Sequence, residues 1–284
     1  MKLVVKVGGT LLDDSAKRLR IGAEIKLQLE GGHQILLVHG GGKQLSRYLE
    51  RSGIPSHFVQ GLRVTTAEAL DGVVKVFAGT VNHELLAAFH QLGVPAVGIS
   101  GIDAGCLVAQ KLVGENGQDW GFVGKITAVD PRLWTVLISE GMLPVMACLA
   151  VGDQGEIYNI NADQAAVACA IHLRADALIF LTDVDGVRDR DGRTLGSIGS
   201  EEIPGLLNSG AVTAGMLAKM NAVQDALAGG VSCVHIGNGQ LNGSLENGIL
   251  QCIARTDRVT EGIHGGTTIF SSSPEPEAAE PRLA

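Results

Sequence analysis

Short apolar runs alternate with longer amphipathic runs along most of the chain. Compact runs rich in valine, isoleucine and leucine predict β-strands at 2–7, 34–39, 94–100, 143–149, 175–184 and 231–236. Between them, apolar side chains that recur every three or four residues predict helices at 15–30, 43–52, 66–91, 131–140, 162–174, 200–209 and 214–228. This alternation favours an α/β fold in which a mainly parallel central sheet lies between two layers of helices.

Some segments depart from this simple alternation. Glycines and alternating apolar residues at 105–128 predict β-hairpins, and short strands are expected near 156–158 and 267–270. Thr65, followed three residues later by Glu68, is typical of a capping box at the start of the longest predicted helix. We expect one continuous helix there, whose apolar face either joins the core or binds a second copy of the chain.

Composition and charge limit the possible classes of function. The 284 residues carry a net charge of −8 with scattered lysines and arginines, so a basic surface for nucleic acid is not expected. No apolar stretch reaches the roughly 18 residues of a membrane-spanning helix. The five separated cysteines lack a zinc-binding spacing and favour buried free thiols in a reducing cytoplasm. The Pro/Glu/Ser/Ala-rich segment 271–284 is predicted to be disordered.

Two glycine turns follow predicted strands. Gly8 and Gly9 end the first strand, and Gly41 and Gly42 lie between the second strand and a helix. Ligands of parallel sheets bind at the carboxyl ends of strands, and a helix N-terminus attracts phosphate or carboxylate groups. Taken singly, such glycines are equally compatible with ordinary tight turns. Neither turn matches the GxxxxGK[ST] loop or the GxGxxG fingerprint, so a dinucleotide-binding fold is not indicated.

Three charged residues stand at similar places in the predicted topology. Lys6 lies one residue before the end of the first strand, Asp163 in the first turn of a helix, and Lys219 one turn into another helix. Each has an ordinary explanation, namely an edge lysine that reaches solvent, helix capping, or a surface lysine. Together with the glycine turns they predict a cleft that holds a triphosphate and a second anion.

Seven motifs occur along the chain in a specific order. They are KVGGTLL at 6–12, VHGGG at 38–42, GLRVT at 61–65, DWGFVGKI at 119–126, NINADQAA at 159–166, LTDVDGV at 181–187 and GMLAK at 215–219. The ordered set resembles the amino acid kinase family, and most closely its members that phosphorylate N-acetyl-L-glutamate. Each motif alone is loose, but the resemblance covers roughly residues 2–270, nearly the whole chain apart from the tail.

The resemblance implies an open three-layer α/β/α sandwich in two lobes, as in carbamate kinases. Residues 1–174 would form an N-terminal lobe that binds N-acetyl-L-glutamate and dimerises, and residues 175–270 a C-terminal lobe that binds ATP. The implied reaction is ATP-dependent phosphorylation of the substrate's side-chain carboxylate, the second step of arginine biosynthesis. Mg²⁺ would accompany ATP in a cytoplasmic homodimer that binds neither nucleic acid nor membrane.

The resemblance also implies roles for individual residues. Lys6 and Lys219 would stabilise the transition state, and Asp163 would orient both lysines. The residues expected at the acetylglutamate are Gly41, Gly42, Arg63 and Asn159. The residues expected at the nucleotide are Gly8, Gly9, Asp183 and Thr213. No residue is expected to bind a metal through a dedicated protein cluster.

Other interpretations remain open from the sequence. One is a kinase of lysine biosynthesis that acts on carrier-linked aminoadipate or glutamate, although Arg63 favours a small substrate with a free α-carboxylate. Another is a non-catalytic nucleotide-binding relative, which retention of both lysines and Asp163 disfavours. Lys125 stands where many relatives carry an acidic residue, and we attach no mechanism to it. The first strand has no helix before it, which in this family favours a homodimer without arginine feedback.

Overall fold

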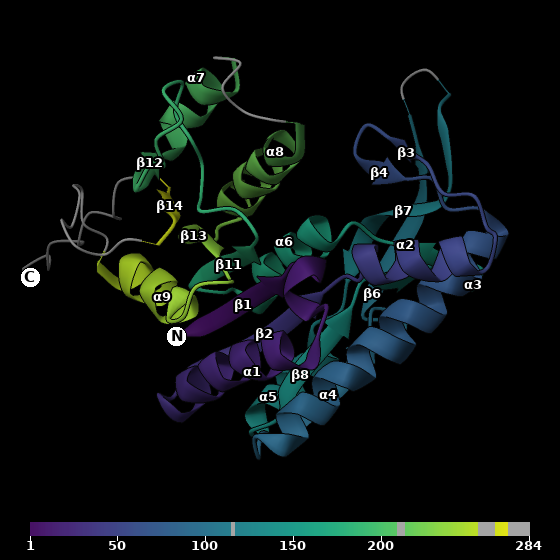
Figure 1. Ribbon diagram of the computed structural model, residues 1–284, viewed down its shortest axis with the longest axis horizontal. Helices are drawn as coiled ribbons and strands as arrows, with labels where there is room; N and C mark the ends of the chain where they lie inside the picture. Colours follow the sequence, from purple (N-terminus) through teal and green to yellow (C-terminus); the bar gives the residue numbers. More distant parts are fainter. Residues whose placement is uncertain (115–116, 209–213, 255–264, 272–284) are drawn as a thin grey trace, which may run out of the picture.

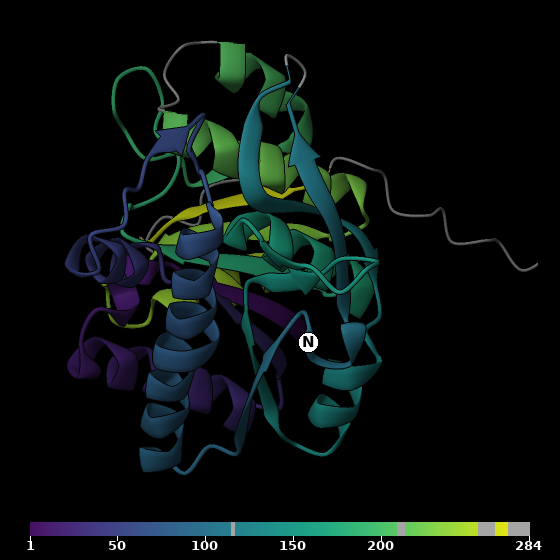
Figure 2. The same ribbon diagram turned by 90° about the vertical axis from the view of Figure 1, so that its right-hand side faces the viewer.

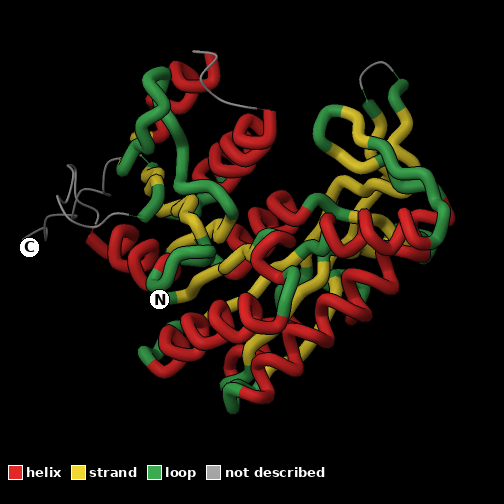
Figure 3. The backbone as a smooth tube through the Cα atoms, viewed as in Figure 1, coloured by secondary structure: helices red, strands yellow, loops and turns green. Residues whose placement is uncertain are grey.

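The structure is a computed structural model that describes residues 1–114, 117–208, 214–254 and 265–271. Within these ranges an eight-stranded sheet forms the centre of the molecule (Figures 1 and 3). Its spatial order is β12 (Ser197–Gly199), β14 (Thr267–Phe270), β13 (Cys233–Asn238), β11 (Ala177–Thr182), β1 (Lys2–Val7), β2 (Gln34–His39), β8 (Leu143–Ala147) and β5 (Ala96–Ser100). Neighbouring strands run parallel except β13 and β14. The predicted α/β fold with a mainly parallel sheet is confirmed.

Helices cover both faces of this sheet, as Figure 3 shows in red on either side of the strands. One face carries α1 (Ser15–Glu30), α2 (Gly42–Arg51), α3 (Ala67–Val74), α4 (Asn82–Gln91) and α9 (Ser244–Ala254). The opposite face carries α5 (Arg132–Ser139), α6 (Ala162–Leu173), α7 (Ile203–Asn208) and α8 (Ala214–Ala228). Each predicted strand and helix has a counterpart, because short continuous apolar runs and a 3.6-residue period distinguish buried strands from amphipathic helices.

A small closed barrel extends the structure beyond one end of the sheet. It consists of β6 (Leu107–Val113), β7 (Asp119–Val129), β9 (Leu149–Val151) and β10 (Ile157–Asn159). The long hairpin of β6 and β7 confirms the hairpin predicted at 105–128. A two-stranded ribbon of β3 (Phe58–Val59) and β4 (Leu62–Arg63) lies next to β7 in Figure 1. Thr65 N donates to Trp120 O at 2.9 Å and ties the ribbon to the hairpin.

The longest predicted helix differs from a uniform α-helix. A π-helical segment, η2 (Lys75–Val81), joins α3 to α4, and Figure 2 shows the run as one long rod. The capping residue is Thr66, whose hydroxyl accepts from Ala69 N at 3.2 Å, so the prediction of Thr65 is wrong by one position. A π segment adds a residue within a helix and reorients the side chains that follow it.

The prediction of five free thiols is wrong for one pair. Cys233 on β13 and Cys252 on α9 form a disulfide, and their Cα atoms are 5.8 Å apart. No sequence pattern indicates this pairing, because the two positions meet only when α9 packs on β13. The free cysteines among the described residues are Cys106, Cys148 and Cys169, all buried as expected.

Two further predictions concern the tail and membranes. Of the segment 271–284, only Ser271 belongs to the described residues, so the predicted disorder of 272–284 concerns residues outside them. No helix within the described ranges combines the length and apolar character needed to cross a lipid bilayer.

Candidate active site

Three charged side chains from distant parts of the sequence meet at one point. The Nζ of Lys6 lies 2.8 Å from Oδ1 of Asp163, and the Nζ of Lys219 lies 2.8 Å from Oδ2 of the same carboxylate. The three side chains are only 12 to 16% exposed. The structure therefore places one carboxylate between two ammonium groups, with a net charge of +1.

The fold explains why these three side chains converge. Side chains alternate along β1, so Lys6 points to the same face as Val4, where α6 and α8 pack. β1 has strands on both sides, which excludes the interpretation of Lys6 as a lysine on an edge strand. Asn161 caps α6 by accepting from Asp163 N at 2.9 Å, which fixes Asp163 in the first turn. Lys219 reaches the same carboxylate from the second turn of α8.

Burial and neighbouring charges shift the pKa values of Asp163 and Lys219 in opposite directions. Burial by itself would raise the pKa of Asp163, but the ammonium groups of Lys6 and Lys219 outweigh it and hold that pKa well below its usual range. Burial lowers the pKa of Lys219, while the charge of Asp163 opposes that change. The Nζ of Lys219 also lies 5.2 Å from the centre of the Phe180 ring. The carboxylate therefore stays ionised and keeps the two cations in place.

A cavity of 610 Å³ opens in front of the two lysines. It lies between α8, which contributes Met216, and the ribbon and hairpin, which contribute Phe58 and Val123; these parts face each other in Figure 1. The predicted site residues that line it are Lys6, Gly8, Gly9, Gly41, Gly42, Arg63, Asn159, Asp183 and Lys219. Asp163 is not among the lining residues, but it contacts Lys6 and Lys219, which are. Thr213 lies outside the described residues.

Arg63 forms a second cationic point in the cavity. Its Nη2 donates to Gly42 O at 3.0 Å and to Ser46 Oγ at 2.7 Å, and its Nη1 donates to Ser56 Oγ. The guanidinium lies 4.5 Å from the centre of the Phe58 ring, and burial lowers its pKa. Among the described residues, no carboxylate forms an ion pair with Arg63, which is only 8% exposed. A buried cation that neutral groups hold in place is suited to an anionic ligand.

The two glycine turns face each other across a short distance. A methyl group on Gly9 would lie 3.4 Å from the backbone nitrogen of Gly42, at the start of α2. A methyl group on Gly41 would lie 2.8 Å from the Phe77 ring, so that position has no room for a side chain. The N-terminus of α2 therefore presents bare backbone N–H groups to the cavity, an arrangement that favours phosphate or carboxylate oxygens.

Several residues in the cavity or beside it were not predicted from the sequence. Ser46, Ser56 and Phe58 hold Arg63 in place, yet their sequence spacing carries no chemical pattern. Lys43 also lines the cavity, and its position directly after Gly42 could have indicated this. Asn159 was expected, and its Nδ2 donates to Thr65 Oγ1 at 3.0 Å. Tertiary contact, rather than local sequence, identifies the serines and the phenylalanine.

Comparison with known proteins agrees with this geometry. Residues 1–238 match the model of the amino acid kinase family. The acetylglutamate kinase of Solibacter usitatus is 48% identical over 246 residues, 87% of this chain and 94% of that protein. The acetylglutamate kinase of Acidobacterium capsulatum is 43% identical over 236 residues, 83% of this chain and 90% of that protein.

A solved structure shares the fold of this chain. The N-acetylglutamate synthase of Neisseria gonorrhoeae, complexed with coenzyme A and N-acetyl-glutamate, matches with a TM-score of 0.82 and 28% identity. The match covers 96% of this chain but only 60% of the synthase chain, so the synthase contains a further part that this chain does not match. The chain therefore belongs to the amino acid kinase family, within which it groups with the acetylglutamate kinases.

Proposed function

We propose that this chain uses ATP to phosphorylate the side-chain carboxylate of N-acetyl-L-glutamate, which yields N-acetyl-L-glutamyl 5-phosphate for arginine biosynthesis. The single observation that carries the proposal is the pair of lysines on Asp163 beside a cavity that also contains Arg63. Such a cavity has separate cationic points for a phosphoryl group and for a small dicarboxylate. Relatives with 40 to 48% identity bear the name acetylglutamate kinase, which supports this choice of substrate.

The chemistry requires charge neutralisation rather than a general base. The attacking carboxylate is already ionised at neutral pH. It must approach a phosphoryl group that is itself anionic, and two unit charges 4 Å apart repel by about 4 kcal/mol at an effective dielectric constant near 20. Lys6 and Lys219, held 2.8 Å from Asp163, would offset this repulsion as charge develops on the oxygens in transit. Catalysis then consists of positioning plus electrostatic stabilisation.

Substrate recognition follows from the remaining polar groups of the cavity. Arg63 would bind the α-carboxylate, because a guanidinium forms two parallel hydrogen bonds to a carboxylate. Asn159 would contact the same substrate, and the N–H groups at Gly41 and Gly42 would lie near the transferred phosphate. The residues proposed for the nucleotide are Gly8, Gly9, Asp183 and Thr213.

Mg²⁺ would enter with ATP and supply further charge neutralisation at the phosphates. Both oxygens of Asp163 already lie 2.8 Å from ammonium groups, which argues against its role as a metal ligand. In the part of the chain that the structure describes, no cluster of three His, Cys, Asp or Glu side chains could hold a metal ion. The cavity therefore fits a Mg²⁺ ion that nucleotide phosphates and water would hold, which is the usual arrangement for Mg²⁺.

We further propose two lobes, a dimer and a cytoplasmic location. Residues 1–174 would bind acetylglutamate and form the dimer contact, and residues 175–270 would bind ATP. The run from α3 to α4 is the candidate dimer element, although its apolar side chains Phe77, Leu85 and Phe89 are buried within the chain. Its exposed polar face would then form the contact. The cytoplasm is the compartment in which ATP is available to such an enzyme.

A substrate comparison tests the proposed function. Initial rates of ADP release would be measured with ATP and, as acceptor, N-acetyl-L-glutamate, L-glutamate, L-aspartate, L-2-aminoadipate or carrier-linked aminoadipate. We expect turnover with N-acetyl-L-glutamate far above that with the three free amino acids. Absence of turnover with N-acetyl-L-glutamate would overturn the proposal, and activity only on carrier-linked aminoadipate would establish the alternative.

A further inference from the structure

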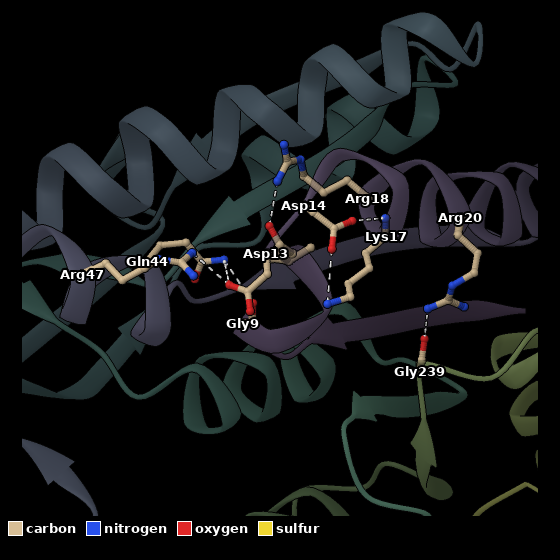
Figure 4. A network of polar contacts seen from close by, with 10 residues as sticks. Gly9, Asp13, Asp14, Lys17, Arg18, Arg20, Gln44, Arg47 and Gly239 are labelled. Carbon is tan, nitrogen blue, oxygen red and sulfur yellow. Dashed lines mark hydrogen bonds and ion pairs between the residues drawn. The ribbon is translucent and has the colours of Figure 1, made fainter.

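Three polar side chains outside the lysine–aspartate trio connect the two glycine turns (Figure 4). The Nε2 of Gln44 donates to Gly9 O at 3.0 Å and to Asp13 Oδ1 at 3.3 Å. The Nη2 of Arg47 donates to the same oxygen of Asp13 at 3.0 Å. We name Asp13, Gln44 and Arg47 the latch, because they join the turn after β1 to the first turns of α2.

The latch occupies one side of α2, and the proposed substrate site lies on another. Gln44 and Arg47 are three residues apart and therefore share a face of the helix. Ser46 projects differently and accepts from Arg63 at 2.7 Å. Asp13 ends the short 3₁₀ helix η1 (Gly9–Leu12), which follows Gly8 and contacts α2. The position of α2 is thus fixed on one side relative to Gly9 and on the other relative to Arg63.

Two wall segments of the cavity depend on this connection. Gly9 and Gly42 both line the cavity, and Gly42 N would lie only 3.4 Å from a methyl group placed on Gly9. We propose that Gln44 and Asp13 are positioning residues for phosphoryl transfer, because they fix the distance between the Gly8–Gly9 and Gly41–Gly42 turns. This inference rests on the proposed function, in which the first turn faces the nucleotide and the second faces the acceptor.

The latch would affect the rate by fixing the geometry of the two turns, and not through the strength of its own ion pair and hydrogen bonds. The side chains of Arg47 and Asp13 are 49% and 22% exposed, so solvent screens their ion pair and its own contribution to stability is small. In-line transfer, however, requires the reacting atoms to be aligned about 3 to 3.5 Å apart, and a displacement of about 1 Å can reduce the rate a hundredfold. Loss of the latch should therefore lower kcat more than it lowers substrate affinity.

The test compares Gln44→Met with Gln28→Met. Methionine keeps the approximate shape of glutamine but cannot donate to Gly9 O or Asp13. Gln28→Met makes the same change on α1, at a position about 20 Å along the helix from its N-cap, Asp14. We expect Gln44→Met to lower kcat about tenfold while both KM values stay within about twofold, and Gln28→Met to retain full activity. Asp13→Asn, which keeps an acceptor for Gln44 but loses the charge opposite Arg47, should lower kcat less.

A second measurement does not depend on activity. Hydrogen exchange of peptides covering 8–12 and 40–45, without ligand, should become at least about fivefold faster in Gln44→Met and not in Gln28→Met. Unchanged exchange, or unchanged kcat in Gln44→Met, would overturn the latch. A raised KM with unchanged kcat would also overturn it, because it indicates direct ligand contact. If the unaltered chain does not phosphorylate N-acetyl-L-glutamate, the proposed function fails, while the exchange measurement still decides the latch.

Discussion

Replacement of Lys219 by alanine removes one of the two ammonium groups that flank Asp163. In the structure this group lies 2.8 Å from Oδ2, and its side chain is 13% exposed, so solvent screens its charge only weakly. One unit charge at 4 Å contributes about 4 kcal/mol at an effective dielectric constant near 20. Loss of one transition-state donor reduces kcat by about 10²- to 10³-fold in well-studied enzymes. We therefore expect kcat to fall at least about a hundredfold.

The assay is the initial rate of ADP release at saturating ATP and N-acetyl-L-glutamate. Lys6→Ala should show a loss of similar size, because Lys6 contacts the other oxygen of the same carboxylate. Lys17→Ala is the matched control. Lys17 pairs with Asp14 at 3.3 Å on the surface of α1, with 42% of its side chain exposed, and should be dispensable for catalysis. Far-ultraviolet circular dichroism would show whether each variant is folded.

A specific result would refute this reasoning. If Lys6→Ala and Lys219→Ala both fold and retain full kcat, the two ammonium groups do not stabilise the transferred phosphoryl group. The two ion pairs of Asp163 would then only stabilise the fold, and the reaction centre would lie elsewhere. A loss confined to the KM for ATP would assign the lysines to nucleotide binding rather than to the transition state.

Three further predictions use the same purified protein. Arg63→Ala should mainly raise the KM for N-acetyl-L-glutamate with a smaller effect on kcat, and an unchanged KM in initial-rate measurements would reject Arg63 as the carboxylate ligand. Burial lowers the pKa of His39 and of His235 to about 4. Between pH 6.5 and about 4 the unfolded chain therefore binds more protons, and the free energy of unfolding should fall as pH falls, by up to about 3 kcal/mol per histidine. Urea denaturation at several pH values measures this, and a flat profile would contradict it. Reduction of the Cys233–Cys252 disulfide, whose cysteines are 19 residues apart, should lower the free energy of unfolding by about 3 kcal/mol. Urea denaturation with and without dithiothreitol tests this, and equal midpoints would count against it.

Much of the fold follows from local periodicity. The compact run of apolar and β-branched residues at 2–7 predicted the strand β1, and the alternation of side chains along any strand directs Lys6 to the face of α6 and α8. The glycine turns at strand ends and the ordered motifs also pointed to an anion site. These features are readable because backbone geometry repeats over a few residues, so that a short segment of sequence suffices to reveal them.

Other features depended on contacts between distant segments. The sequence did not indicate that Ser46 and Ser56 hold Arg63, or that Gln44 joins Asp13 to Gly9. These contacts require a particular strand order and helix placement, which no local pattern encodes.

Local patterns in the sequence were thus enough to locate the strands and helices, the glycine turns and the charged residues of the site. The resemblance led us to expect Asp163 beside both lysines, but its two contacts of 2.8 Å, the Cys233–Cys252 disulfide and the π segment within the long helix emerged from the folded structure alone. The reason is that periodicity follows from short-range backbone geometry. Distances between remote side chains, in contrast, follow from the packing of the whole chain around its sheet.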